Sequence, residues 1–400
     1  MRSAVAVSYE LEDGREAAEE LTASIREKLE LGKNSIGFLM CDADTDGAAL
    51  TRELKNLLGI ETAGMTSRAP LGPDGCCESA AVLLVLTADD CSFSAAVSEP
   101  IADGRHEEKI RAFCETVVPA AARKQGQGIR EQGILFAFCP SNMPFSGDVY
   151  PNALSEAAPG VPVIGGACSD DYDYARARVF LSGREFRDSL VGAGVWGNVK
   201  PVFSLRHVTS RFTERIRRVT AAEGNVVRRV GDETFVEYLE SFGLKTDVPD
   251  PLMAFTSYPM MLTRESGDEI PLMRHILTLN HADGSGSFFG DVPAGSLANM
   301  CLISRDDIKA ACRESMAALL EEAAKNEDYE YSAIFCASCC GRAIILGADS
   351  GAEGAILAEM LPANLSLAGG YCLGEICPAR YRDGLVSNRF HNCSIAFCMF

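Results

Sequence analysis

The stretch that decides the fold lies near the C-terminus, where residues 331–347 read YSAIFCASCCGRAIILG, residues 351–361 read GAEGAILAEML and residues 365–378 read LSLAGGYCLGEICP. The apolar run that opens it has the length of a strand. The middle segment reads as a helix, with Ile356, Leu357 and Met360 as its apolar positions. A second strand follows and breaks at Gly369-Gly370. The layout is therefore strand, loop, helix, strand and glycine turn.

Weaker versions of this layout occur twice earlier in the chain. Residues 35–64 run from the strand-like SIGFLMC through a helical stretch to a second strand with a glycine turn. Residues 133–166 run from GILFAFCP through a short helix to VPVIGG. The pattern predicts a mixed α/β fold in which duplicated strand-helix-strand units form mixed β-sheets covered by helices. The alternative is that such repeated strand-helix-strand patterns arise by chance in any α/β chain. No fixed period recurs, which excludes a solenoid.

Chain length predicts more than one domain. A chain of 400 residues is longer than a domain with a single hydrophobic core usually is, so we expect two domains. The turn Glu223-Gly224-Asn225 lies between two strand-like runs and is typical of a hairpin. With the border placed beside this turn, the predicted domains are residues 1–221 and 222–400.

Composition limits the partners. The net charge is −19 and the pI is near 4.8, so nucleic acid and anionic membranes would be repelled. The N-terminus lacks the apolar core of a signal peptide, and the longest apolar stretch, residues 80–86, is too short to span a bilayer. We therefore expect a cytoplasmic protein with no nucleic acid partner and no membrane partner.

Further elements follow from apolar spacing and turn residues. Helices are predicted at residues 14–31, with Gly32 as the C-cap, and at residues 107–124, with a kink or break at Pro119. Ser304 is expected to cap a long helix, and residues 251–259, PLMAFTSYP, read as a strand. The run DADTDG at residues 42–47 lacks the downstream glutamate of a calcium loop, so it is expected to cap the next helix.

The sixteen cysteines favour packing over metal binding. In a reducing cytosol they should not form disulfides, and several lie in apolar runs where a free cysteine acts as a small hydrophobe. Cys336, Cys339 and Cys340 form a C-x-x-C-C group, followed by Cys372 and Cys377. These spacings match no zinc-finger pattern, so no metal is predicted.

Two arginines and one glutamate suggest a binding site. Arg274 and Arg342 lie on or beside apolar strands, where a buried cation needs a carboxylate partner. Glu375 follows Gly374 in a glycine-rich turn. An arginine can bind a carboxylate while a glutamate binds an ammonium, so together they would suit an amino acid. The alternative is that Arg342 and Glu375 pair with each other inside the fold.

The order of motifs resembles the FIST family, the F-box and intracellular signal transduction proteins. FCASCCGR resembles the family's F-S-C-x-x-R block, GGYCLGEICP its G-F-Y-T-x-G-E-I-x-P block, and His391-Asn392 the H-N that precedes its last strand. Glu353 and Arg274 match an acidic and a basic position of the family, whereas TAGMTSRAPLGPDG at residues 62–75 matches its first turn only loosely.

The resemblance implies an N-terminal and a C-terminal FIST domain and a sensory function rather than an enzymatic one. The ligand would be a small metabolite such as an amino acid, and the signal would pass in trans to a separate protein partner. The ligand-binding residues expected from motif matching and charge are Arg274, Cys339, Arg342, Tyr371, Gly374, Glu375, His391 and Asn392. No catalytic residue and no metal ligand are expected.

Two alternatives remain open at this point. Some members of the family that this chain resembles bind haem and sense nitric oxide, and His275 or His207 would be the axial ligand in that case. A cysteine-dependent enzyme would use Cys339, with His391 as its imidazole partner. Each alternative rests on a single residue with no established neighbour, so a small-ligand sensor without a cofactor is preferred.

Overall fold

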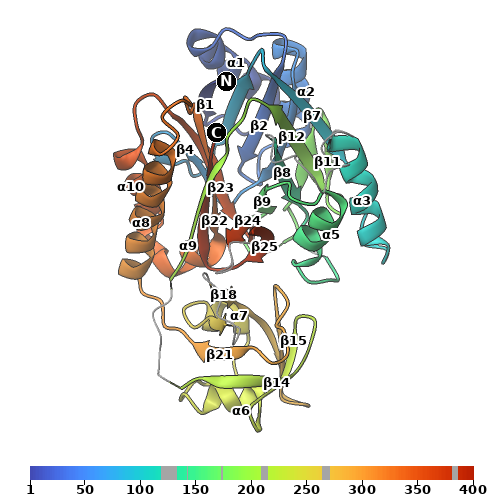
Figure 1. The fold of residues 1–400 in the computed structure, drawn as a ribbon, viewed down its shortest axis with the longest axis vertical. Coiled ribbons are helices and arrows are strands. Elements are labelled where there is room, and N and C mark those ends of the chain that lie inside the picture. The colour runs from blue at the N-terminus through green and yellow to red at the C-terminus, as the bar shows by residue number, and fades with distance from the viewer. Residues whose placement is uncertain (119–132, 142, 173, 209–214, 264–270, 381–385) are drawn as a thin grey trace.

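The computed structural model describes residues 1–118, 133–141, 143–172, 174–208, 215–263, 271–380 and 386–400. It consists of a large α/β body that contains both termini and a smaller β-rich unit below it (Figure 1). We call the smaller unit, residues 217–300, the insert, because the chain leaves the body after β13 (Val202–His207) and returns to it at α8 (Arg305–Ala324). The predicted mixed α/β class is confirmed.

The body contains three strand-helix-strand units, and each closes a pair of parallel strands. All three were predicted from the sequence. The first is β2 (Ser35–Cys41), α2 (Gly47–Leu58) and β3 (Glu61–Thr66); the second is β8 (Gly133–Cys139), α5 (Val149–Ala157) and β9 (Val163–Ala167); the third is β22 (Ala333–Cys339), α10 (Ala352–Met360) and β23 (Ser366–Cys372). The third unit also contains α9 (Cys340–Leu346) and the 3-10 turn η1 (Gly347–Asp349).

Each parallel pair lies at the centre of a six-stranded sheet, and the three sheets share one strand order. The orders are β1-β6-β2-β3-β10-β11, β7-β12-β8-β9-β24-β25 and β13-β26-β22-β23-β4-β5. The strands that flank the pairs on one side are β1 (Arg2–Ser8), β6 (Ala81–Thr87), β7 (Cys91–Val97), β12 (Val191–Gly197) and β26 (Ser394–Met399). The body is therefore a threefold repeat.

Short hairpins are exchanged around this repeat. The hairpin of the first unit joins the sheet of the third, that of the second joins the first, and that of the third joins the second. The hairpins are β4 (Pro70–Gly72) with β5 (Gly75–Cys76), β10 (Val179–Leu181) with β11 (Arg184–Phe186), and β24 (Glu375–Arg380) with β25 (Val386–His391). The exchange ties the N-terminal and C-terminal parts of the chain into one body.

Helices cover the outer faces in pairs. α1 (Gly14–Lys28) packs on α2, α3 (His106–Val117) on α5, and α8 on α10. The predicted caps Asp46 and Ser304 accept hydrogen bonds from backbone amides at the starts of α2 and α8. α1 ends at Lys28, and its C-cap is Leu29 instead of the predicted Gly32, because the backbone at Leu29 is already extended. The break expected at Pro119 lies outside the described residues.

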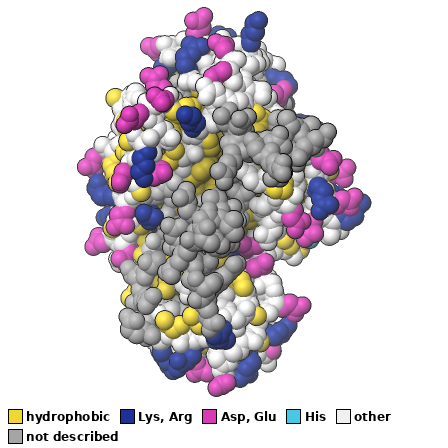
Figure 2. Space-filling view, viewed as in Figure 1, with side chains coloured by type: hydrophobic (Ala, Val, Ile, Leu, Met, Phe, Trp, Pro, Cys, Tyr) yellow, Lys and Arg dark blue, Asp and Glu magenta, His cyan; other side chains and the backbone are white. Residues whose placement is uncertain are grey.

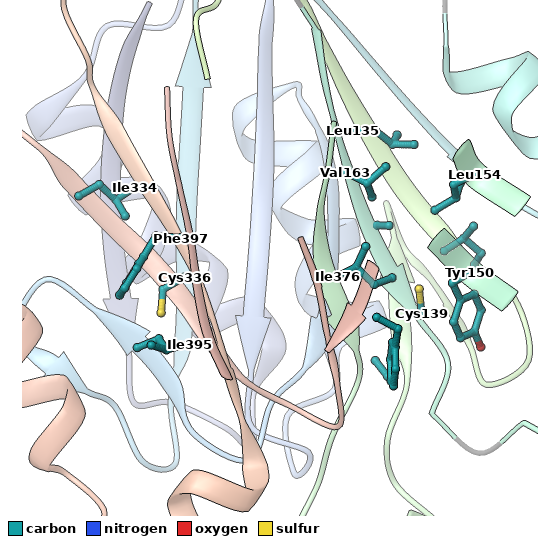
Figure 3. Packing of buried hydrophobic residues seen from close by; sticks show 14 of the residues in the cluster. Leu135, Cys139, Tyr150, Leu154, Val163, Ile334, Cys336, Ile376, Ile395 and Phe397 are labelled. Carbon is teal, nitrogen blue, oxygen red and sulfur yellow. The ribbon is translucent and has the colours of Figure 1, made fainter. Parts of the chain in front are cut away.

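A shared aromatic cluster joins the three sheets. Phe38 of β2, Phe136 of β8 and Phe335 of β22 come from the first strand of each unit, with ring centroids 4.3 Å apart for Phe38–Phe136 and 5.4 Å apart for Phe136–Phe335. A second large cluster fills the spaces under the helices, with Ile334 and Phe397 on one side and Leu135, Val163 and Leu154 on the other (Figure 3). Burial of this surface drives the folding of the body.

The insert is built on an antiparallel sheet of order β18-β17-β21-β14-β15-β20-β19. The hairpin predicted at Gly224 joins β14 (Arg217–Glu223) to β15 (Val226–Val230). The remaining elements are β16 (Glu233–Thr234), α6 (Phe235–Glu240), α7 (Pro251–Phe255), β17 (Met260–Thr263), β18 (Leu272–Arg274), β19 (Ile276–Asn280), β20 (Ser285–Phe288) and β21 (Leu297–Met300). The expected domain border after residue 221 falls inside β14.

One predicted strand is wrong. Residues 251–259 begin with the helix α7, because Pro251 occupies its first turn and the Asp250 carboxylate accepts a hydrogen bond from the Met253 amide. A proline at the first helical position and an acidic cap favour a helix start, and they outweigh the strand-like apolar run.

Candidate ligand-binding site

A cavity of about 380 Å³ lies between the body and the insert, and we call it the aromatic cavity. Its lining residues are Pro140, Ser141, Met143, Pro144, Phe145, Gly147, Tyr150, Ala167, Tyr174, Asn225, Leu277, Thr278, Phe288, Phe289, Leu373 and Phe390. Tyr150 is buried between α5 and the edge of its sheet, where Figure 3 shows it beside Cys139. The volume is typical of sites for small molecules. Among these lining residues none carries a charge. Figure 2 shows the charged side chains spread over the outer surface of both parts.

The loop after β9 supplies one aromatic wall. The buried Asp170 carboxylate accepts hydrogen bonds from the backbone amides of Tyr174 at 3.1 Å, Arg176 at 3.0 Å and Ala177 at 3.2 Å. These bonds hold Tyr174 at a φ of +59°, a left-handed conformation that costs a tyrosine about 1–3 kcal/mol. Tyr174 lines the cavity, and its hydroxyl is buried with no hydrogen-bond partner in the described part of the chain. Such an atom can bind a polar group of a ligand.

A second and smaller cavity of about 20 Å³ adjoins the first. It is lined by Tyr172, Leu252, His275, Phe289, Cys339, Cys340, Gly341, Ile344, Leu373 and Asn392. Phe289 and Leu373 line both cavities, so these two side chains lie at the boundary between them. The volume holds about one water molecule or one small polar group. Two of the predicted ligand-binding residues, Cys339 and Asn392, lie here.

Arg274 lies beside the aromatic cavity and joins the insert to the body. Its Nη2 donates to Asp148 Oδ2 at 2.8 Å, its Nε to the Asp291 carbonyl at 2.9 Å, and its Nη1 to the Phe390 carbonyl at 3.0 Å. The same Asp148 oxygen accepts a hydrogen bond from the Asp291 amide at 2.7 Å. The side chain of Arg274 is fully buried. Arg274 is therefore a buried cation with a carboxylate partner, as predicted, and this partner is Asp148 of the protein itself.

Arg342 is the centre of a buried polar network in the third unit. Its Nη2 lies 2.7 Å from Glu353 Oε1 and donates to the Ile308 carbonyl at 3.1 Å. Glu353 Oε2 accepts hydrogen bonds from Ser338 Oγ at 3.1 Å and from the Tyr371 hydroxyl at 3.0 Å. The alternative that Arg342 pairs with Glu375 is wrong, because its ion-pair partner is Glu353. Neither cavity is lined by Arg342 or Tyr371.

Glu375 is buried at the start of β24. Its Oε2 accepts hydrogen bonds from the amide and the hydroxyl of Ser394, and Cys372 Sγ lies 3.5 Å from its Oε1. Burial raises the pKa of Glu375 to about 8. Gly374, with a φ of +138°, has the Phe390 ring against its α-carbon, where a Cβ would overlap the ring. Glycine is needed there for the approach of an aromatic side chain.

Among the described residues, His207, His275 and His391 lie in no space that would fit haem. His391 lies in contact with His207, with ring centroids 5.2 Å apart, and neither lines either cavity. His275 faces the small cavity, which has no room for a macrocycle, and its ring packs on Gly341. Burial lowers the pKa of His207 to about 3 and of His275 to about 4.

The cysteine chemistry also argues against a thiolate nucleophile. All sixteen thiols are free, and every one is buried except that of the half-buried Cys76. Burial raises the pKa of Cys339 well above its ordinary value and that of Cys340 to about 12. His391 Nε2 lies 3.2 Å from the Cys377 carbonyl, and no contact with Cys339 is seen among the described residues.

The comparison with protein families covers most of the chain. The FIST N domain matches residues 35–233, and the FIST C domain matches residues 233–378. This chain belongs to the FIST family. FIST domains are associated with signal transduction and with the sensing of small ligands. No match was found among curated proteins.

Both FIST domains contribute to the aromatic cavity. Phe145 and Tyr174 lie within the FIST N match, whereas Phe288 and Leu373 lie within the FIST C match. The two matches meet at residue 233, inside the insert, so the border between them is not the border between body and insert. No helix in the described ranges of this FIST protein is long and apolar enough to cross a bilayer.

Sequence signals for the aromatic wall were weak. Phe145 lies in the turn-rich run CPSNMPFSGD, Tyr172 and Tyr174 in the polar run DDYDY, and Phe288-Phe289 in a run that reads as a connection. Aromatic side chains in polar loops, directly after buried strands, were a usable signal. Charge matching pointed instead to Arg342 and Glu375, whose partners lie in the protein core.

Proposed function

We propose that this FIST protein is a sensor for a small, uncharged and largely apolar metabolite that binds in the aromatic cavity. The observation that carries the proposal is a cavity of about 380 Å³ with an aromatic lining that includes Tyr174, whose buried hydroxyl has no partner among the described residues. Apolar walls with a few polar groups are typical of small-molecule sites, in which the polar groups fix the orientation of the ligand. Ser141, Asn225 and Thr278 supply further polar groups.

An amino acid is the second candidate. A free amino acid would bring two charges against a lining whose described residues carry none, and an unpaired buried charge is costly. The Arg274–Asp148 ion pair lies beside the cavity, next to the lining residues Phe390 and Gly147. If this pair opened, Arg274 would bind the carboxylate of the amino acid and Asp148 its ammonium. Because the pair is closed, an uncharged ligand is favoured.

The position of the cavity suggests how binding becomes a signal. A ligand in it would contact the body through Phe145 and Tyr174 and the insert through Leu277 and Phe288. Such a ligand stabilises one arrangement of the two parts over others, by its differential affinity for them. A separate protein that recognises this arrangement would receive the signal. The proposal includes no turnover, and binding alone is expected to change the protein.

Ligand-dependent thermal stability tests this function. A panel of small aromatic alcohols, amides and amino acids is screened for a rise in the melting temperature of the full chain. Met143→Trp should fill the aromatic cavity and abolish the rise, since Met143 is a half-buried lining residue. Tyr174→Phe should weaken binding about tenfold, the cost of one buried hydrogen bond.

Tyr238→Phe is the matched control. The Tyr238 hydroxyl is also buried without a hydrogen-bond partner in the described residues, but it lies in α6 and does not line the cavity. This variant should bind the ligand as the wild type does. A ligand that raises the melting temperature of Met143→Trp as much as that of the wild type would place the binding site elsewhere.

A further inference from the structure

Two residues that line the small cavity carry buried polar atoms without partners. His275 Nε2 and Asn392 Oδ1 have no hydrogen-bond partner in the described residues, and their side chains are 3% and 1% exposed. His275 comes from the insert, whereas Asn392 comes from the turn before β26 in the body. Buried polar atoms in proteins are nearly always hydrogen-bonded, so two such atoms at one cavity indicate a binding position.

Neighbouring contacts show that both atoms are acceptors. The Asn392 amide nitrogen donates to the His391 carbonyl at 3.0 Å, which leaves Oδ1 facing away from that bond. A hydrogen bond from the His275 ring to the Thr256 backbone leaves Nε2 with its lone pair, and burial keeps the imidazole neutral. A group that fits between these atoms must therefore donate hydrogen bonds.

The small cavity also adjoins the proposed ligand site. Its volume of about 20 Å³ holds a single hydroxyl or amino group and not a second ring. Phe289 and Leu373 line both cavities, and Phe289 is only half-buried. A ligand whose apolar part fills the aromatic cavity can therefore place its polar end past these two side chains.

We infer that the small cavity is a polar subsite that binds an uncharged hydrogen-bond donor of the ligand, such as a hydroxyl or an amide nitrogen, and rejects a carboxylate or a phosphate. The inference rests on the proposed function and specifies its ligand class. An anion would place its oxygens against two acceptors. Among the described lining residues the thiols of Cys339 and Cys340 are weak donors, and the Tyr172 hydroxyl already donates to the Cys340 carbonyl at 3.4 Å. The Arg274 guanidinium is bound to Asp148 and does not line this cavity.

Three probes with one aromatic body and different ends test the inference. Binding of 2-phenylethanol, 3-phenylpropanamide and 3-phenylpropanoate to the full chain is measured by ligand-observed NMR and calorimetry. The alcohol and the amide should bind at least about tenfold more tightly than the carboxylate, which is the selectivity of one buried hydrogen bond. Asn392→Leu should remove most of this difference. Asn299→Leu, which alters another buried asparagine outside both cavities, should preserve it.

The outcomes separate the subsite from the proposed function. Equal binding of all three probes, with loss of binding in Met143→Trp, would overturn the subsite and leave the aromatic cavity as the ligand site. Tighter binding of the carboxylate would also overturn the subsite and favour Arg274 as the recognition residue. No binding of any probe to the wild type would overturn both proposals. If Asn392→Leu fails to fold, the ranking of probes on the wild type decides the question.

Discussion

Arg274 and Asp148 are 126 residues apart in the sequence, and their side chains meet at 2.8 Å between Nη2 and Oδ2. Arg274 belongs to the insert and Asp148 to the second unit of the body. The guanidinium also donates to the Phe390 carbonyl in the exchanged hairpin of the third unit. A single side chain thus fixes three parts of the chain beside the candidate ligand site.

Replacing Arg274 should destabilise the protein strongly. In Arg274→Leu the mostly buried Asp148 carboxylate loses its cation, so we expect a loss of about 3–5 kcal/mol in the free energy of unfolding. Urea denaturation measures this loss. Arg15→Ala is the control, because it removes an exposed, solvent-screened ion pair with Glu19 and should change the stability little. Similar losses of unfolding free energy in the two variants would show that Arg274 does not hold the insert to the body.

The Arg342–Glu353 pair should show strong coupling. Arg342→Met and Glu353→Gln should each cost about 3–5 kcal/mol, because each leaves a buried partner without its ion pair. The double variant should cost less than the sum, since neither charge then remains unpaired. A double-mutant cycle measured by urea denaturation checks this expectation. Additive losses would mean that the two side chains contribute independently.

Glu375 should make stability depend on pH. Burial raises its pKa from 4.5 to about 8, so between these values the folded protein holds a proton that the unfolded chain releases. Stability from this residue is therefore greatest below about pH 4.5 and falls as the pH rises to about 8. Glu375→Gln should lessen this fall by an amount on the order of 5 kcal/mol. Parallel pH profiles of wild type and variant would contradict the prediction.

Gly374 should tolerate no side chain. In Gly374→Ala the new Cβ would overlap the Phe390 ring, and the φ of +138° is unfavourable for alanine. We expect a loss of about 1–3 kcal/mol. Gly351→Ala is the matched control, because a Cβ added there would meet no atom within 4 Å and the backbone φ is −73°. Differential scanning calorimetry compares them, and equal melting temperatures would contradict the packing argument.

The predictable part of the fold consists of local patterns. Apolar runs bounded by glycine predicted the three strand-helix-strand units, and Ser304 and Asp46 marked helix starts through their own side chains. The strand expected at residues 251–259 failed because Pro251 and Asp250 favour a helix start, a signal that the apolar run obscured. No local sequence pattern predicted the hairpin exchange, because strand pairing depends on partners that are distant in the chain.

The candidate site was harder to predict because its residues come from distant segments. Motif matching located Cys339 and Asn392, which do line the small cavity. Charge matching paired Arg342 with Glu375. In the structure, the ion-pair partner of Arg342 is Glu353, which lies in α10. A role in ligand binding stays a prediction for the other residues, whose observed contacts are within the protein: Arg274, Arg342, Tyr371, Gly374, Glu375 and His391.

Local sequence was enough to specify the repeated units, their helix caps and the family to which the chain belongs, because each depends on residues close together along the chain. The exchange of hairpins, the partner of each buried charge and the position of the aromatic cavity emerged only in three dimensions. These features depend on which surfaces meet when the body and the insert pack together. Burial and hydrogen bonding then select partners by distance in space, for which separation along the sequence is no guide.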